Sequence, residues 1–163
     1  MPTIISNNLL GKMPVSDDAI IRINLAWVSL NEAKKIIDKS RHAIYLDYPD
    51  GRTKPPTPTI TFDEAVELSK HKNVIYFAFS NATLGKVKRM KGKVNCILVP
   101  KIETEQGVKE VPAMIKEGIK TVMLDKEDLY SSVDCNPDEF NKLLDEVRSY
   151  KVNILELQGV VFI

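Results

Sequence analysis

Several residues that mark common classes of protein are scarce in this sequence. Its 163 residues include two cysteines, two histidines and one tryptophan, and the net charge is +1. Two cysteines do not build a disulfide framework, and the absence of HxH, CxxC and Gly-rich phosphate-loop spacings argues against zinc, Rossmann and P-loop nucleotide sites. A nearly balanced charge gives no argument for nucleic acid or an anionic membrane surface as a partner.

Long apolar runs are missing as well. No stretch approaches the roughly 18 residues that a membrane-spanning helix needs, and residues 1–12 do not have the pattern of a secretory signal. We therefore expect no membrane and no nucleic acid among the partners, and a reducing cytoplasm as the compartment. The length and the 44% hydrophobic content predict a single domain over residues 1–163.

Short apolar runs alternate with amphipathic stretches along the chain. Most runs are apolar on both faces, which is typical of a covered parallel sheet. Helix starts are indicated by a capping box of Ser29 and Glu32, by Thr61 as an N-cap and by Pro137 in a first turn. We expect strands at residues 3–6, 19–25, 43–48, 74–80, 95–102, 121–125, 153–157 and 160–163. We expect helices at residues 29–41, 62–72, 81–91, 105–118 and 137–151.

This repeated alternation predicts parallel βαβ units in an α/β fold. Seven or eight strands favour a (β/α)8, or TIM-like, barrel. Such barrels usually take about 200–250 residues, so we expect a small or truncated one. An open doubly wound sheet is the alternative.

Polar residues interrupt the apolar runs where the expected strands end. In a barrel, the carboxyl ends of the strands carry the functional groups. A rim with two arginines, a lysine and several carboxylates suits a divalent metal ion with an anionic substrate. The alternative is that these are solvated loop residues and that Arg22 forms a core ion pair with Asp47 or Glu103. The residues concerned are Arg22, Asn24, Asp47, Arg52, Ser80, Asn81, Lys101, Glu103 and residues 125–128.

Five segments that contain these polar residues resemble segments of the barrel domain of pyruvate kinase and occur in the same order along the chain. Aldolases of the HpcH/citrate lyase type share a similar pair among them, the last two. The resemblance implies a single barrel domain that lacks the nucleotide-covering and C-terminal domains of pyruvate kinase. The segments are RINLAW (22–27), LDYPDGRTK (46–54), IYFAFSNATLGKVK (75–88), KIETEQGV (101–108) and VMLDKEDL (122–129).

The resemblance also implies a role for individual residues toward a small anion such as phosphoenolpyruvate or pyruvate. Glu103 and Asp128 match the ligands of Mg²⁺, and Lys101 matches the lysine that stabilises charge on the transferring phosphoryl group. Arg22 matches a catalytic phosphate contact, and the positions that match a monovalent-cation site, normally for K⁺, are Asn24 and Asp47. The substrate-binding positions are Arg52, Ser80 and Lys126.

The sequence departs from the family pattern at several of these positions. Ala26 stands where the family has a serine, Glu127 where it has a glycine and Lys126 where it has an arginine. Residues 54–60 stand where the covering domain is inserted. Three functions therefore stay open: a pyruvate kinase-like phosphotransferase, a pyruvate-dependent aldolase or lyase, and a non-catalytic pseudoenzyme or interaction domain. The apolar run at 160–163 predicts a homodimer, because an unpaired strand edge invites a second chain. The non-catalytic alternative includes a domain separated from a larger parent protein.

Overall fold

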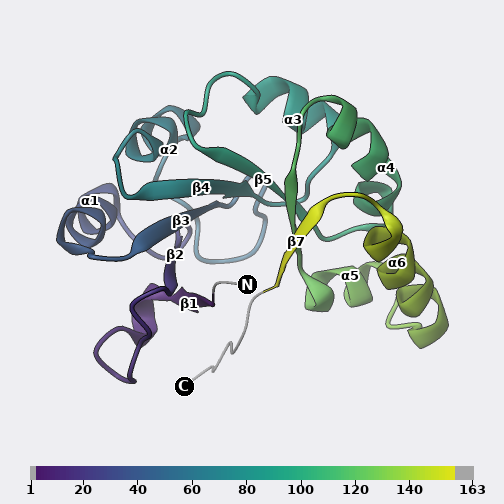
Figure 1. Cartoon of the computed structure of the whole chain (residues 1–163), viewed down its shortest axis with the longest axis horizontal. Helices are drawn as coiled ribbons and strands as arrows, with labels where there is room; N and C mark the ends of the chain where they lie inside the picture. The colour runs from purple at the N-terminus through teal and green to yellow at the C-terminus, as the bar shows by residue number, and fades with distance from the viewer. Residues whose placement is uncertain (1–2, 157–163) are drawn as a thin grey trace.

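The computed structural model describes residues 3–156, which form one sheet of seven parallel strands with helices between them (Figure 1). The strands are β1 (Ile4–Ser6), β2 (Ile20–Asn24), β3 (Ala43–Tyr48), β4 (Val74–Phe79), β5 (Ile97–Ile102), β6 (Thr121–Leu124) and β7 (Asn153–Glu156). The helices are the short 3₁₀ helix η1 (Asn7–Leu9), α1 (Leu30–Lys39), α2 (Phe62–Ser69), α3 (Leu84–Met90), α4 (Glu105–Lys116), α5 (Lys126–Ser132) and α6 (Pro137–Ser149).

The strands follow one another across the sheet in the order of the sequence, from β1 to β7. A doubly wound sheet reverses its strand order at a switch point, and this sheet does not. Figure 1 shows the sheet curled, with α1 to α4 and α6 along its convex side and β1 and β7 as its two edges. The fold is thus an α/β half-barrel, and the predicted α/β class is confirmed.

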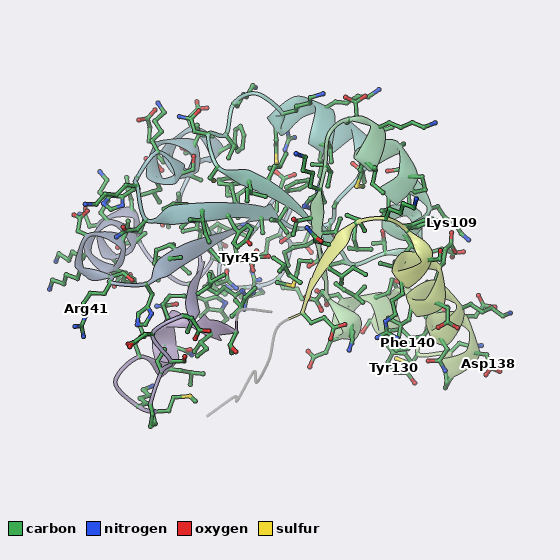
Figure 2. All side chains as sticks on the ribbon, in the orientation of Figure 1. Arg41, Tyr45, Lys109, Tyr130, Asp138 and Phe140 are labelled. Atoms are coloured by element: carbon green, nitrogen blue, oxygen red, sulfur yellow. The ribbon has the colours of Figure 1, made fainter. Side chains whose placement is uncertain are left out.

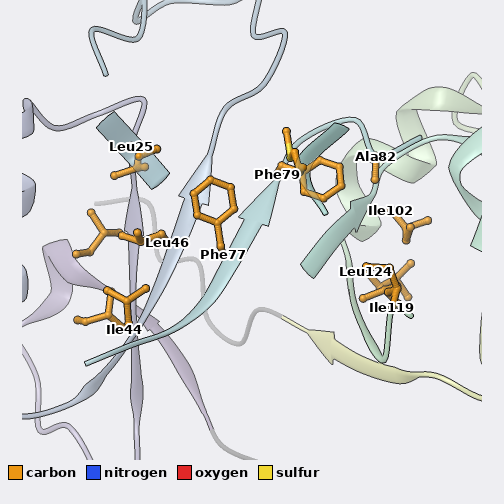
Figure 3. Packing of buried hydrophobic residues seen from close by; sticks show 14 of the residues in the cluster. Leu25, Ile44, Leu46, Phe77, Phe79, Ala82, Ile102, Ile119 and Leu124 are labelled. Atoms are coloured by element: carbon orange, nitrogen blue, oxygen red, sulfur yellow. The ribbon is translucent and has the colours of Figure 1, made fainter. Parts of the chain in front are cut away.

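Alternate residues of each strand point to opposite faces of the sheet. On the convex side, Leu46 and Phe77 pack in the large core beneath the helices (Figure 3). On the concave side, Tyr45 packs with Val99 and Met123 in a smaller apolar cluster, and Figure 2 shows Tyr45 inside the curve of the sheet. Both faces are therefore apolar over most of their length, as the sequence predicted.

The predicted helix starts at residues 29, 61 and 137 are confirmed. The Ser29 hydroxyl accepts a hydrogen bond from the Glu32 amide at 3.2 Å, and the Glu32 carboxylate accepts one from the Ser29 amide at 2.8 Å. Thr61 forms the same capping box at α2, and Pro137 lies in the first turn of α6.

Two helices were not predicted, and some predicted elements are shorter than expected: α2 ends at Ser69 and β5 begins at Ile97. The helix expected from residue 81 begins at Leu84, because Asn81 has a left-handed backbone (φ 50°) and the N-cap is Thr83. Helix α5 lies where the sequence indicated only site or loop residues, and its N-cap is the Asp125 side chain. The other unpredicted helix, η1, is a single short turn.

The predicted strand at residues 160–163 lies outside the described residues, as does the strand edge on which the expected dimer rested. Within the described part of the chain, no helix is both long and apolar enough to span a membrane.

Candidate functional site

A pocket of about 520 Å³ lies at the carboxyl ends of the strands. It is lined by eight of the nine residues to which the resemblance assigned a role, so these eight share one location in the fold. The ninth, Lys126, is not among the lining residues, and its ammonium group lies 3.0 Å from the Glu156 carboxylate. The eight are Arg22, Asn24, Asp47, Arg52, Ser80, Lys101, Glu103 and Asp128.

The alternation of strand residues explains why these side chains meet. In β3, Asp47 lies two residues after Tyr45 and so shares its concave face. Lys101 and Glu103 are likewise two residues apart at the end of β5. Backbone hydrogen bonds continue the pairing just beyond the strands and hold these ends together. The amides of Leu25, Ser80 and Asp125 donate to the carbonyls of Asp47, Tyr48 and Ile102 at 3.0, 3.1 and 3.3 Å.

A network of buried ion pairs forms the floor of the pocket. The Arg22 guanidinium donates from Nε to the Asp47 carboxylate at 2.9 Å. The Lys101 ammonium group lies 3.1 Å from Glu103 and 3.4 Å from the same Asp47 carboxylate. Asp47 is only 2% exposed, and Lys101 and Glu103 are each 5% exposed. The ion pair between Arg22 and Asp47, which the sequence offered as an alternative, is therefore present in the structure.

Burial and neighbouring charge act against each other on these groups. Burial alone raises the pKa of Asp47, but the charges of Lys101 and Arg22 outweigh it and lower that pKa below its ordinary value. Burial lowers the pKa of Lys101, yet Asp47 and Glu103 raise it overall. For Glu103 burial prevails over the attraction of Lys101, so its pKa is raised. Glu103 is thus a carboxylate that gains from a further positive charge.

Glu103 is also held by backbone from the neighbouring strand connection. The amide of Asn81 donates a hydrogen bond to its carboxylate. The start of α4 packs closely on this connection, because a Cβ atom added at Gly107 would lie 3.2 Å from the carbonyl oxygen of Ala82. Glycine at position 107 therefore permits the close approach that fixes the backbone around Glu103.

Three carboxylates form one wall of the pocket, the carboxylate wall, and lie close enough together to hold a cation. One oxygen each of Glu103, Asp125 and Asp128 lies within 4.8 Å of the others. Asp125 also caps α5, because its side chain accepts a hydrogen bond from the Asp128 amide at 3.2 Å. Carboxylate oxygens are the donors that Mg²⁺ and Ca²⁺ prefer, so the donor set fits a hard divalent ion.

Sequence reasoning placed Asp125 on the rim but did not name it as a metal ligand. In the segment of residues 122–129, the resemblance matches only Asp128 to a metal ligand, so it gave no reason to choose Asp125. The spacing was the available signal. An aspartate directly after a strand can cap a helix by accepting a hydrogen bond from the amide three residues later, which brings Asp125 close to Asp128.

The remaining predicted residues also line the pocket, and each has a hydrogen bond within the protein. The Asn24 side-chain oxygen accepts a hydrogen bond from the Ala26 amide at 3.0 Å. The Ser80 carbonyl accepts one from the Lys86 ammonium group at 3.2 Å. Arg52 donates to the carbonyls of its own loop, at 2.9 Å to Lys54, 2.8 Å to Pro55 and 3.2 Å to Pro56.

The pocket therefore combines buried, paired charge at its floor with a cluster of carboxylates and with the cationic side chain of Arg52. Such an arrangement suits positioning and electrostatic stabilisation of an anion beside a metal ion. No protein-family model matches the chain, and no curated protein matches its sequence.

Proposed function

We propose that this chain is a pyruvate kinase-like barrel domain that binds Mg²⁺ and a small anion of the phosphoenolpyruvate or pyruvate type. The TIM-like barrel is part of this proposal, and the sequential parallel sheet supports it. One observation carries the functional part: eight residues nominated from sequence line one pocket at the carboxyl ends of the strands. Active sites of such barrels lie at that end.

In this proposal the carboxylates of Glu103, Asp125 and Asp128 hold Mg²⁺. The ion would polarise a carboxylate or phosphoryl oxygen of the anion. Lys101, buried and protonated, would donate hydrogen bonds to an oxygen on which charge develops. Arg22 orients Lys101 indirectly, because both side chains bind the same Asp47 oxygen.

The proposal needs no K⁺ ion. Asp47 is already engaged by the two cationic groups of Arg22 and Lys101, so a third positive charge would meet repulsion there.

Calorimetric titration tests the binding claim directly. Oxalate, a planar dianion with two carboxylates, is the probe, added to the wild type with and without Mg²⁺. We expect oxalate to bind only when Mg²⁺ is present, because the carboxylate wall repels a bare anion. Glu103→Ala and Asp128→Ala should each abolish Mg²⁺-dependent binding. Binding that survives in both variants would exclude this site.

Phosphoryl transfer is then tested separately, by ATP formation from phosphoenolpyruvate and ADP. A second candidate, a pyruvate-dependent aldolase or lyase, is favoured by the connection between β3 and α2, which is a loop of residues 49–61 in the place of a covering domain. Such an enzyme would release pyruvate from hydroxy acids without any nucleotide. Mg²⁺ and oxalate binding without either activity would indicate the pseudoenzyme.

We also propose a cytoplasmic location, since Cys96 and Cys135 are both free thiols. The expected homodimer remains a proposal, which light scattering over a range of protein concentrations would test.

A further inference from the structure

The charged residues that line the pocket are unevenly neutralised. Four are cationic, namely Arg22, Arg52, Lys54 and Lys101, and four are acidic, namely Asp47, Glu103, Asp125 and Asp128. On the floor, Arg22 and Lys101 are balanced by Asp47 and Glu103. Two positive charges and two negative charges are left on the walls.

The two positive charges both lie on the loop that follows β3. Among residues 3–156, no carboxylate lies within 4.0 Å of the Arg52 or the Lys54 side chain. The two negative charges, Asp125 and Asp128, belong to the carboxylate wall, and Asp125 approaches the Lys101 ammonium group only to 4.0 Å. A divalent cation at that wall and a doubly charged anion toward the loop would neutralise both.

The two loop cations differ in how free they are to bind a ligand. The Arg52 guanidinium is committed to three carbonyls of its own loop, and it lies 6.0 Å from the centre of the Trp27 ring. One of those carbonyls belongs to Lys54 itself, which fixes the Lys54 backbone beside the pocket. Arg52 is therefore a positioning residue, and the exposed Lys54 side chain is the cation left available.

We propose that Lys54 is a specificity-determining residue, which binds a second anionic group of a ligand whose first carboxylate lies at the metal ion. This inference rests on the proposed function and deepens it. The preferred ligand is then an anion whose two charged groups are separated, such as a carboxylate and a phosphate. A compact dicarboxylate placed wholly at the metal ion would not reach Lys54.

The test compares two probes in calorimetric titrations with Mg²⁺. Oxalate represents the compact dianion, and 2-phosphoglycolate carries its carboxylate and its phosphate on either side of one carbon. In Lys54→Gln we expect the Kd of 2-phosphoglycolate to rise about tenfold or more, which corresponds to the loss of one charge-assisted hydrogen bond. The Kd of oxalate should change less than twofold, and Lys54→Arg should keep most of the affinity for 2-phosphoglycolate.

A matched control is Lys72→Gln, which removes the same charge from another exposed position, just before β4 at the opposite end of the strands. It should leave both affinities unchanged. Trp27 is the only tryptophan, it is 67% exposed, and it contacts the Arg52 side chain. Its fluorescence therefore gives a second readout at the loop, which should respond to 2-phosphoglycolate more than to oxalate.

The outcomes separate this inference from the function on which it rests. If neither probe binds the wild type with Mg²⁺, the proposed function fails and the role of Lys54 with it. If oxalate binds but Lys54→Gln leaves 2-phosphoglycolate unaffected, or weakens both probes equally, only the role of Lys54 is overturned.

Discussion

Replacing Asp47 by asparagine tests whether buried charge at the pocket floor stabilises the fold. The side chain is 2% exposed, and it accepts from Arg22 at 2.9 Å and lies 3.4 Å from the Lys101 ammonium group. Asparagine keeps the size and one acceptor oxygen but removes the negative charge. Arg22 would then lose its only ion-pair partner among the described residues, whereas Lys101 would keep Glu103 at 3.1 Å.

Removing one partner of a buried ion pair costs about 3–5 kcal/mol, because the other partner stays buried without compensation. Since Lys101 keeps Glu103 and Arg22 is 14% exposed, we expect the lower end, about 3 kcal/mol. With a urea dependence of about 2 kcal/mol per molar, the unfolding midpoint should fall by roughly 1.5 M.

Urea unfolding at pH 7 is the assay, with Glu67→Gln as the control. Glu67 pairs with Lys70 on an exposed helix face, and its loss should cost about 1 kcal/mol or less.

The pKa of Asp47 is lowered in the folded protein, so its contribution to stability is complete above the ordinary Asp pKa of about 3.9 and is lost as the pH falls below it. The difference between wild type and Asp47→Asn should therefore be constant from pH 7 to about 5 and shrink below about 4. A cost as small as that of the control would refute the reasoning.

Three further outcomes follow from other parts of the molecule. The pKa of Glu103 is raised, so protons compete with a metal ion for this carboxylate at a pH above the ordinary Glu pKa of about 4.3. Calorimetry should therefore show weaker Mg²⁺ binding at pH 5 than at pH 7, and equal affinity at both values would contradict this. The Tyr45 hydroxyl is buried without a hydrogen-bond partner among the described residues. Tyr45→Phe should therefore raise the free energy of unfolding by about 1 kcal/mol in urea titrations. A loss of stability would contradict this and would show that the hydroxyl has a partner. The Asn136 side-chain oxygen caps α6 by accepting hydrogen bonds from the amides of Asp138 and Glu139. Asn136→Ala should lower the midpoint of thermal unfolding by an amount equivalent to about 1 kcal/mol. An unchanged midpoint would mean that the cap does not stabilise the protein.

Much of the fold was readable from the sequence because its signals are local. Strand β3 (Ala43–Tyr48) was predicted at its observed bounds, since an apolar run flanked by polar residues fixes both ends. Helix α5 was missed because residues 126–132 are short and mostly polar, and its start depends on the Asp125 cap rather than on an apolar period. The curl of the sheet, which brings the strand ends together, is a tertiary property that no single segment encodes.

The site shows the same division. That Lys101 and Glu103 point the same way follows from their spacing in an extended chain, and the two side chains do contact each other. The sequence could not predict that Arg52 donates its hydrogen bonds to carbonyls of its own loop, because these contacts depend on the path of the chain through the prolines that follow. Lys126 shows the opposite case, where a position matched by resemblance turns away to pair with Glu156.

The central claim is that Glu103, Asp125 and Asp128 hold one divalent ion together. Mn²⁺ has the same preference for oxygen ligands as Mg²⁺ and gives an anomalous X-ray signal, so a crystal grown with Mn²⁺ locates the ion directly. We expect one anomalous peak about 2.2 Å from a carboxylate oxygen of each of the three residues, and its loss in Asp128→Ala. A crystal with no peak at these carboxylates, or with the ion bound elsewhere in the pocket, would contradict the account.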